Sequence, residues 1–206
     1  MDVTYYFWLV VILFISVAYQ QEYVYAHGFK LQPKPDFKDA HATARWLVSQ
    51  NTWGILSTTS IDLQGVPFGN VVSFSDGPPG KETGIPYFYL TSLDPTARDL
   101  QKDSHCSFTV SEVPLGTCKE TDPENPTCSK LTLTGKMELI MNGPEADFAA
   151  QALFSKHGEM TDWPADHDFH FFKLVIENIF LIDWFGGPKP LSVEEYLQPG
   201  GLISSD

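Results

Sequence analysis

The sequence predicts an α+β domain whose core is a closed or nearly closed antiparallel β-barrel with peripheral helices. Three observations lead to this fold class: at least six segments are β-prone, only three are amphipathic helices, and most connections are short enough for hairpins. A doubly wound parallel sheet would need a helix between most pairs of strands, and the sequence has too few. The 206 residues fit one such domain, and 43% hydrophobic residues can fill its core.

The N-terminus is expected to be a signal peptide for export. Residues 3–21 carry no charge and residues 7–15 are continuously apolar, as in the h-region of a signal peptide. Residues 1–26 are assigned to the signal peptide, and small residues suited to a signal peptidase place the cleavage after Ala18 or Ala26. An uncleaved membrane anchor is the alternative, although the apolar centre is shorter than the roughly 20 residues of a membrane span.

A linker at residues 27–35 leads into the domain, which begins with a helix and a hairpin. Asp36 is a candidate N-cap for a helix that ends near Asn51. Residues 53–59 and 66–74 are β-prone and are separated by turn residues 62–65, which predicts two paired strands. The helix should bury Phe37, Ala40, Ala44, Leu47 and Val48, and the second strand should place Val66, Phe68, Val72 and Phe74 on one face.

The middle of the chain contains a Gly/Pro-rich loop, a strand and a short helix. Residues 85–90, after the loop at 76–84, are apolar at both side-chain parities and therefore predict a central strand. Asp94 followed by Pro95 is an N-cap with proline at the first helical position, which predicts a helix to about Asp103.

The C-terminal half is expected to alternate strands with one long helix. Residues 106–113 and 130–141 predict strands on either side of a cysteine-containing loop, and residues 169–185 predict two strands joined around Glu177 and Asn178. A helix is expected between residues 130–141 and 169–185, and Asn142 and Glu145 are the candidate capping pair at its start. The second strand should place Leu131, Leu133, Met137, Leu139 and Met141 on one face, and the helix should bury Ala146, Ala149, Ala150, Leu153 and Phe154.

The three cysteines fit an exported protein with a single disulfide. Cys118 and Cys128 flank a polar, proline-bearing segment that cannot form a helix or a central strand, so a disulfide between them would hold a loop. Zinc binding by the same pair is the alternative, but the tight Cys-x-x-Cys spacing and a second ligand pair are missing. Cys106 lies in a β-prone run and is expected to be a buried free thiol.

Several distinctive segments occur together and resemble one known family. They are Trp53-Gly54, Val66–Gly80 (VPFGNVVSFSDGPPG), Gly84–Leu90 (GIPYFYL), Trp184–Lys189 (WFGGPK) and Glu194–Tyr196 (EEY), with the cysteine loop between them. In this combination the chain resembles the CREG family, the cellular repressors of adenoviral early-protein-stimulated genes. The resemblance assigns residues 36–198 to one domain and leaves residues 199–206 as a flexible tail.

The resemblance implies a split β-barrel like that of the FMN-dependent pyridoxamine-phosphate oxidases, assembled as a homodimer. It also implies a secreted or endolysosomal, non-enzymatic protein linked to growth and differentiation, without bound FMN. The net charge of −13 argues against direct binding of nucleic acid or anionic membranes. One departure concerns sorting through N-glycans: the sequence has no Asn-x-Ser/Thr acceptor, because Pro126 follows Asn125 in the only near-match.

The resemblance also points to one candidate ligand site, for the phosphate of a flavin. Thr91, Ser92 and Arg98 follow a strand in the region where FMN-binding split barrels place hydroxyls and a basic side chain, and Arg98 could hold a phosphate through two charge-assisted bonds. Residues 70–73 would then line the isoalloxazine edge. The alternative is that the hydroxyls only end a strand and Arg98 is a solvated helix charge.

A stretch rich in histidine and acid is the second candidate. His157, His167 and His170, with Glu159, Asp162, Asp166 and Asp168, offer metal-ligand chemistry, but their spacing fits no regular metal motif, so a polar loop surface is the alternative. These histidines could instead make dimerisation sensitive to endosomal acidity. Neither a Gly-x-Ser-x-Gly elbow nor a Walker-type phosphate loop is present, so no catalytic residue is assigned.

Overall fold

A computed structural model describes residues 31–198. The predicted signal segment, residues 27–30 of the linker and the tail at 199–206 lie outside the described residues. The chain divides into two units, residues 1–32 and 33–206, and the second contains the domain. Its strands are β1 (Trp53–Thr59), β2 (Pro67–Ser73), β3 (Tyr87–Thr91), β4 (His105–Ser111), β5 (Lys130–Leu139), β6 (Phe169–Ile182) and β7 (Lys189–Pro190). Its α-helices are α2 (Ala40–Gln50), α3 (Pro95–Lys102), α4 (Pro144–Lys156) and α5 (Val193–Leu197), with 3₁₀ turns at Val113–Leu115, Gly158–Asp162 and Ala165–His167.

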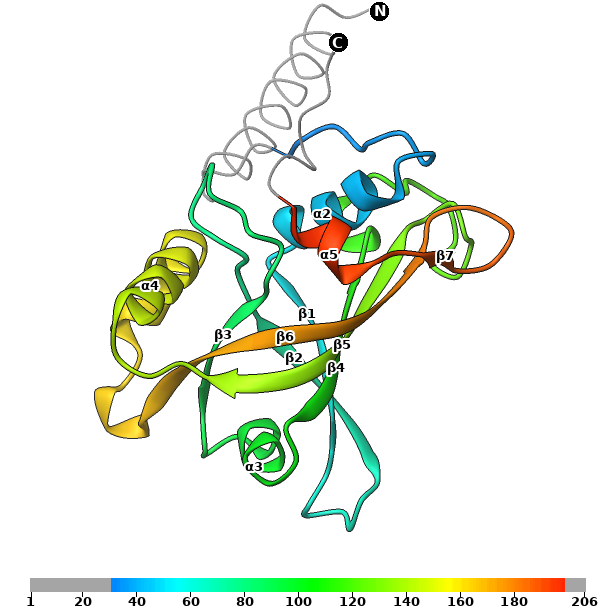
Figure 1. Cartoon of the computed structure of the whole chain (residues 1–206). Coiled ribbons are helices and arrows are strands. Elements are labelled where there is room, and N and C mark those ends of the chain that lie inside the picture. The colour runs from blue at the N-terminus through cyan, green and yellow to red at the C-terminus, as the bar shows by residue number, and fades with distance from the viewer. Residues whose placement is uncertain (1–30, 199–206) are drawn as a thin grey trace, which may run out of the picture. The chain divides into compact units, whose positions relative to one another are not determined.

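The strands form one curled antiparallel sheet, which confirms the predicted α+β barrel class. The order is β2-β1-β4-β5-β6-β3, with β7 added to β6 (Figure 1). The two terminal strands of this path, β2 and β3, approach each other at one end, where Ser75 and Tyr87 form an isolated antiparallel bridge. Because no ladder joins β2 to β3 beyond that bridge, the barrel is split along this seam.

Aromatic side chains fill the centre of the barrel. The rings of Phe74 and Phe88 both pack against Phe108, with centroid distances of 4.7 and 5.1 Å in edge-to-face geometry. All three side chains are fully buried. A second, smaller core lies between α4 and the outer surface of β3 and β6, where Tyr87 and Leu153 are buried (Figure 1).

The prediction that residues 85–90 form a central strand is wrong. β3 is a terminal strand that pairs only with β6 apart from its single bridge. Both of its faces are nevertheless covered, because Phe88 and Leu90 point into the barrel while Tyr87 and Tyr89 face α4. A helix on the outer face therefore produces the same apolar pattern as two flanking strands would.

The prediction of two strands within residues 169–185 is also wrong. β6 runs unbroken to Ile182, and its pairing with β5 shifts between Thr134 and Gly135, so that Glu177 is the extra residue of a β-bulge. A Cβ on Gly135 would lie 1.9 Å from the carbonyl oxygen of Val175, so the bulge requires glycine on the facing strand. The polar pair expected to form a turn thus bends one continuous strand.

Two helices start at other residues than predicted. Asp39, not Asp36, caps α2 by accepting a 2.9 Å bond from the amide of Ala42, while Asp36 closes the preceding turn. The N-cap of α4 is Gly143, without a side-chain bond. Glu145 pairs with Lys173 at 2.8 Å instead of completing a capping box with Asn142, so the sequence motif is present but its hydrogen bonds are not.

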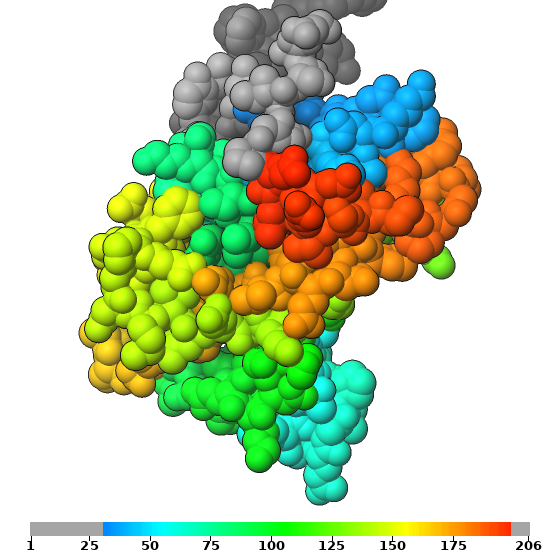
Figure 2. All heavy atoms as spheres, in the orientation of Figure 1, coloured from blue at the N-terminus to red at the C-terminus, as the bar shows by residue number. Residues whose placement is uncertain are grey.

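The C-terminal helix α5 closes one end of the domain. Tyr196 is buried and its hydroxyl donates to the carbonyl of Gly84 at 2.8 Å, while its backbone carbonyl accepts from Arg45 at 3.1 Å. Figure 2 shows α5 (red) lying directly against α2 (blue) on the surface. These bonds fasten the Gly/Pro-rich loop, α2 and the C-terminal segment to one another.

The cysteines behave as predicted. Cys118 and Cys128 form a disulfide, with Cα atoms 5.3 Å apart, and Cys106 is a buried free thiol. Burial raises the pKa of Cys106 to about 12, so this thiol is an inert core group. None of the helices between residues 31 and 198 is both long and apolar enough to span a membrane.

Candidate functional site

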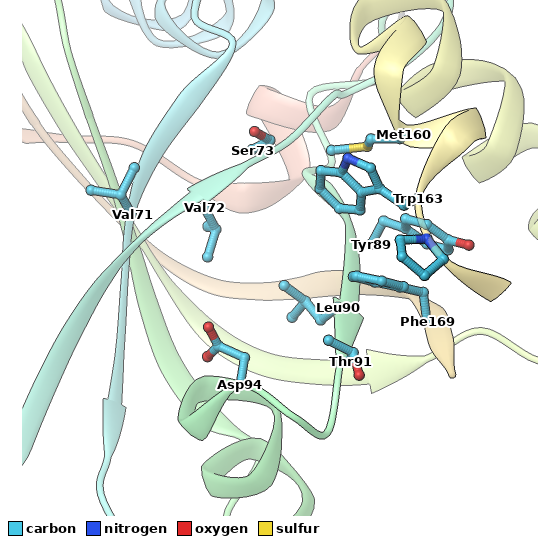
Figure 3. A pocket seen from close by; sticks show the side chains of 11 residues that line it. Val71, Val72, Ser73, Tyr89, Leu90, Thr91, Asp94, Met160, Trp163 and Phe169 are labelled. Carbon is cyan, nitrogen blue, oxygen red and sulfur yellow. The ribbon is translucent and has the colours of Figure 1, made fainter. Parts of the chain in front are cut away.

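The seam between β2 and β3 opens into a cleft of about 450 Å³. Figure 3 shows Val72 on β2 and Leu90 on β3 facing each other across it, with Asp94 at one end and Trp163 at the other. This volume lies in the range typical of small-molecule sites, about 300–1,000 Å³. The lining residues are Val71, Val72, Ser73, Tyr89, Leu90, Thr91, Asp94, Met160, Trp163, Pro164 and Phe169.

One wall of the cleft is a group of packed aromatic rings. Tyr89 stacks on Phe169 with centroids 4.9 Å apart, and Trp163 packs against Phe169 at 5.0 Å. Trp163 is placed by the 3₁₀ turn before it, whose Met160 is buried and accepts a bond from the Trp163 amide. No local pattern in the sequence predicts this wall, although Tyr89 at an outward parity of an all-apolar strand is a usable signal.

The opposite end of the cleft carries a carboxylate. Asp94 caps α3 by accepting from the amide of Thr96 at 2.7 Å, and it also accepts from the side-chain amide of Asn70 at 3.0 and 3.2 Å. Among the described residues that line the cleft, Asp94 is the only charged one. The electrostatic character of the cleft is therefore negative.

The residues predicted to bind phosphate do not converge. Arg98 binds Asp62 at 2.7 Å through Nη2, and its Nη1 donates to the carbonyls of Ser92 and Leu93 at 3.2 and 3.1 Å. The guanidinium is thus engaged outside the cleft. Ser92 is exposed and does not line the cleft, whereas Thr91 does but donates its hydroxyl to the carbonyl of His167.

The segment predicted to face an isoalloxazine ring does border the cleft. Val71, Val72 and Ser73 are all lining residues. Asn70 is not, because its amide binds Asp94 and the hydroxyl of Thr96. Of the four residues expected to line an isoalloxazine edge, Val71, Val72 and Ser73 border the cleft, and Asn70 orients the carboxylate of Asp94.

The candidate metal histidines lie apart from one another. His157 bonds the carbonyl of Phe74 through Nε2 at 2.9 Å, and burial lowers its pKa. His170 pairs with Asp168 at 3.2 Å on the surface, and the ring of His167 lies beside that of Phe169. The structure does not bring the three imidazoles together, so they form no shared metal site within residues 31–198.

Another group of potential metal ligands comprises Glu112, Cys118 and Cys128, whose ligand atoms lie within 4.8 Å of one another. The two sulfurs are joined in the disulfide, which removes the thiolates that zinc would need. Glu112 is buried and binds Lys34 at 2.6 Å and the amide of Ser129 at 2.8 Å. Burial opposes ionisation of Glu112, but these bonds outweigh it and lower its pKa, so the carboxylate pins the segment before α2 to the cysteine loop.

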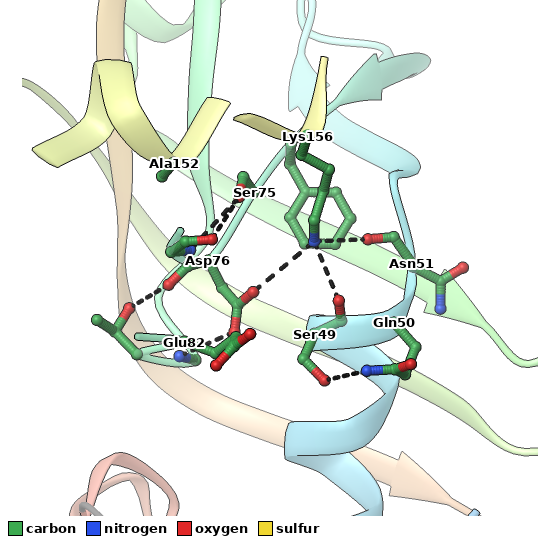
Figure 4. Close-up of polar contacts among 12 residues, drawn as sticks. Ser49, Gln50, Asn51, Ser75, Asp76, Glu82, Ala152 and Lys156 are labelled. Atoms are coloured by element: carbon green, nitrogen blue, oxygen red, sulfur yellow. Dashed lines mark hydrogen bonds and ion pairs between the residues drawn. The ribbon is translucent and has the colours of Figure 1, made fainter. Parts of the chain in front are cut away.

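A buried ion pair lies at the start of the Gly/Pro-rich loop (Figure 4). Lys156 of α4 faces Asp76 at 3.8 Å and donates to the carbonyls of Ser49 and Asn51 at 3.0 and 3.1 Å. Asp76 also accepts from the amide of Gly84 at 3.2 Å. Burial raises the pKa of Asp76 and lowers that of Lys156, while each charge moderates the shift of the other. The pair joins α2, α4 and the loop and does not reach the cleft.

Two adjacent rows of residues on the outer surface of the sheet carry no charged side chain across five strands. Two cross-strand rows, one after the other, contain only apolar, hydroxyl, amide or glycine residues, in a chain of net charge −13. Val71 and Phe180 at the two ends of the first row are 60% and 43% exposed. The first row is Val71, Ile55, Thr109, Thr132 and Phe180, and the second is Gly69, Ser57, Ser107, Thr134 and Asn178.

Comparisons with known proteins show which sequence family the chain matches. Residues 35–198 match the sequence model of a family described as CREG, beta-barrel. Human Protein CREG2 is 44% identical over 161 residues; the match covers 76% of this chain and 55% of the relative, so the chain spans about half the length of that protein.

Two solved structures show the same fold at low identity. A heme binding protein from Mycobacterium smegmatis gives a TM-score of 0.63 at 18% identity, covering 81% of this chain and 62% of that one. A protein related to general stress protein 26, of the pyridoxinephosphate oxidase family, from Clostridium acetobutylicum gives 0.54 at 12% identity, covering 79% and 99%. At these identities the similarity shows the fold alone, and it confirms the predicted split barrel.

Proposed function

Because this chain belongs to the CREG family, we propose that it is a secreted or endolysosomal, non-enzymatic protein that acts as a homodimer through protein contacts. The growth and differentiation role implied by the family resemblance is part of this proposal. The observation that carries its non-enzymatic half is the engagement of Arg98. Its guanidinium is held outside the cleft by Asp62 and by two backbone carbonyls, and no cationic side chain is among the described residues that line the cleft.

The electrostatics of the cleft also support a non-enzymatic protein without bound FMN. A flavin phosphate placed near Thr91 would meet the Asp94 carboxylate instead of a free guanidinium, and like charges at close range repel. The Asp62–Arg98 bond would have to break before Arg98 could bind phosphate. The cleft therefore lacks the charge that would anchor FMN.

The outer sheet surface supports the homodimer. A second copy of this chain carries the same large negative charge, so two copies can meet closely only where few acidic groups lie. The two uncharged rows provide such a surface, and their combination of aliphatic, aromatic and hydroxyl side chains suits an interface core.

The disulfide supports export. Disulfides persist in oxidising compartments and are rare in the cytosol. Because the sequence offers no N-glycan acceptor, sorting of this chain would have to proceed without an N-glycan.

Two measurements on the purified mature protein test the proposal. The visible absorption spectrum should show no flavin band, and light scattering after size exclusion should give twice the chain mass. Phe180→Lys, which places a charge in the first uncharged row, should shift the protein to monomer. Met141→Lys is the matched control, since Met141 is 71% exposed beyond the end of β5 and should leave the dimer intact.

The alternative is an FMN-binding oxidoreductase, favoured by the presence of an open cleft of suitable volume. A yellow protein with stoichiometric flavin that is lost in Arg98→Ala would establish that alternative. A monomeric wild-type protein, or a Phe180→Lys variant that remains dimeric, would refute the assigned contact surface.

A further inference from the structure

The cleft between β2 and β3 combines an aromatic wall with a single carboxylate, and this combination selects a class of ligand. Tyr89, Trp163 and Phe169 present ring faces and edges on one side. Asp94 lies at the other end, as Figure 3 shows. Apolar side chains of Val72 and Leu90 form the surface between them.

The carboxylate of Asp94 is oriented but its charge is not neutralised. It accepts from the Thr96 amide and from the Asn70 side-chain amide, all neutral donors. A carboxylate offers about four acceptor positions, so these contacts leave room for another donor. No ion pair of Asp94 occurs among the described residues, and the nearby Arg98 is bound to Asp62.

The rim of the cleft adds charge of the same sign. Trp163 lies in a segment in which Asp162, Asp166 and Asp168 are all exposed, and only His170 of its neighbours pairs with one of them. Negative potential from the rim and from Asp94 repels anions and attracts cations. Aromatic faces strengthen that preference, because the ring quadrupole attracts a positive group placed over it.

From these features we infer that the cleft binds a small organic cation. Its flat aromatic body, over which the positive charge is delocalised, would lie against Trp163 and Phe169, with the charged nitrogen toward Asp94. This ligand class is opposite in charge to a flavin phosphate. Val71 is the one residue shared by the cleft lining and the two uncharged rows, and neither the aromatic wall nor Asp94 belongs to those rows. Failure of the proposed homodimer or of export can therefore be told apart from failure of this inference.

The test compares two tricyclic probes of similar shape and opposite charge. N-methylacridinium and 9-anthracenecarboxylate are titrated into the purified protein by calorimetry at low salt. The cation should bind at least about tenfold more tightly than the anion, a difference of roughly 1.4 kcal/mol. Its affinity should fall as salt is added, because the partly exposed charges are screened.

Three variants locate the site. Asp94→Asn keeps the helix cap, since Asn and Asp are comparable N-caps, and should weaken cation binding about fivefold while improving anion binding. Trp163→Ala should weaken binding of the cation about tenfold, and Trp163→Phe should weaken it much less. Asp36→Asn, an exposed acid outside the cleft lining, is the matched control and should leave both affinities unchanged.

Four results would overturn the inference. The first is the anion binding as tightly as the cation or more tightly. The second is absence of cation binding at about 1 mM probe. The third is an unchanged cation affinity in Asp94→Asn when thermal melting shows that variant to be folded. A folded Trp163→Ala variant with wild-type affinity would equally remove the aromatic wall from the site.

Discussion

Replacing Lys156 with methionine should destabilise the domain more than any surface substitution, because it leaves a buried carboxylate without its partner. The side chains of Lys156 and Asp76 are only 3% and 0% exposed. Methionine has a similar length and apolar stem, so the substitution removes the ammonium with little loss of volume. The effect therefore measures the charge and its hydrogen bonds rather than a cavity.

The magnitude follows from the contacts of the ammonium group. Removing one partner of a buried ion pair costs about 3–5 kcal/mol, and the 3.8 Å separation places this pair at the lower end, about 3. The carbonyls of Ser49 and Asn51 each lose a bond, at about 1 kcal/mol each. We expect the free energy of unfolding to fall by about 5 kcal/mol, mostly through Asp76.

A second substitution separates the two contributions. In the double variant Lys156→Met, Asp76→Asn, the unpaired charge is gone and the amide oxygen can still accept from Gly84. The double variant should therefore recover about 2 kcal/mol relative to Lys156→Met alone. Urea unfolding followed by tryptophan fluorescence gives all four free energies of the cycle.

The pH dependence of the stability of Lys156→Met provides an independent test of this reasoning. Burial raises the folded-state pKa of Asp76 above its ordinary 3.8, and loss of Lys156 raises it further. The native state then holds a proton that the unfolded state has released, so stability increases as the pH falls toward 3.8. The loss of unfolding free energy caused by Lys156→Met, relative to the unsubstituted protein, should therefore become smaller in acid. An Asp76→Asn substitution that destabilises the Lys156→Met protein further would refute this reasoning.

Three other perturbations have defined outcomes. Burial lowers the pKa of His157 below its ordinary 6.5, so the folded protein should lose stability as the pH falls below 6.5 and the unfolded chain takes up a proton more readily. The melting temperature of His157→Gln should therefore drop less than that of the unsubstituted protein between about pH 7.5 and about pH 5. Replacing Cys118 and Cys128 with serine should lower the free energy of unfolding by about 3 kcal/mol in urea titrations, and equal stability would contradict the loop-closure argument. Gly135→Ala forces its Cβ onto the carbonyl of Val175 and should cost about 3 kcal/mol or prevent folding; a wild-type urea midpoint would show that the bulge can shift.

The strands were predictable from the sequence where pairing is local. The hairpin of β1 and β2 and the alternation of β5 follow from period-two patterns and turn residues. The hairpin is present, and the alternation of β5 holds as far as Met137, beyond which Leu139 and Met141 are exposed. The position of β3 was not predictable, because coverage by α4 produces the same pattern as burial within a sheet. The unbroken β6 was missed because a polar bulge resembles a turn until its partner at Gly135 is known.

The candidate site was predictable only in outline. Thr91 does border the cleft, as its place after a strand indicated. The engagement of Arg98 depends on Asp62, 36 residues away, and no local pattern encodes that contact. The aromatic wall likewise unites Tyr89 with Trp163 from a distant loop. Sequence reasoning found the residue types near the cleft but not their partners, which set its charge.

Titration of the purified protein with FMN, followed by quenching of flavin fluorescence, tests the central claim most directly. With Arg98 bound to Asp62 and Asp94 unneutralised, we predict no saturable binding up to about 100 µM FMN. Stoichiometric binding with a dissociation constant near 1 µM, weakened at least about tenfold by Arg98→Ala, would contradict the account.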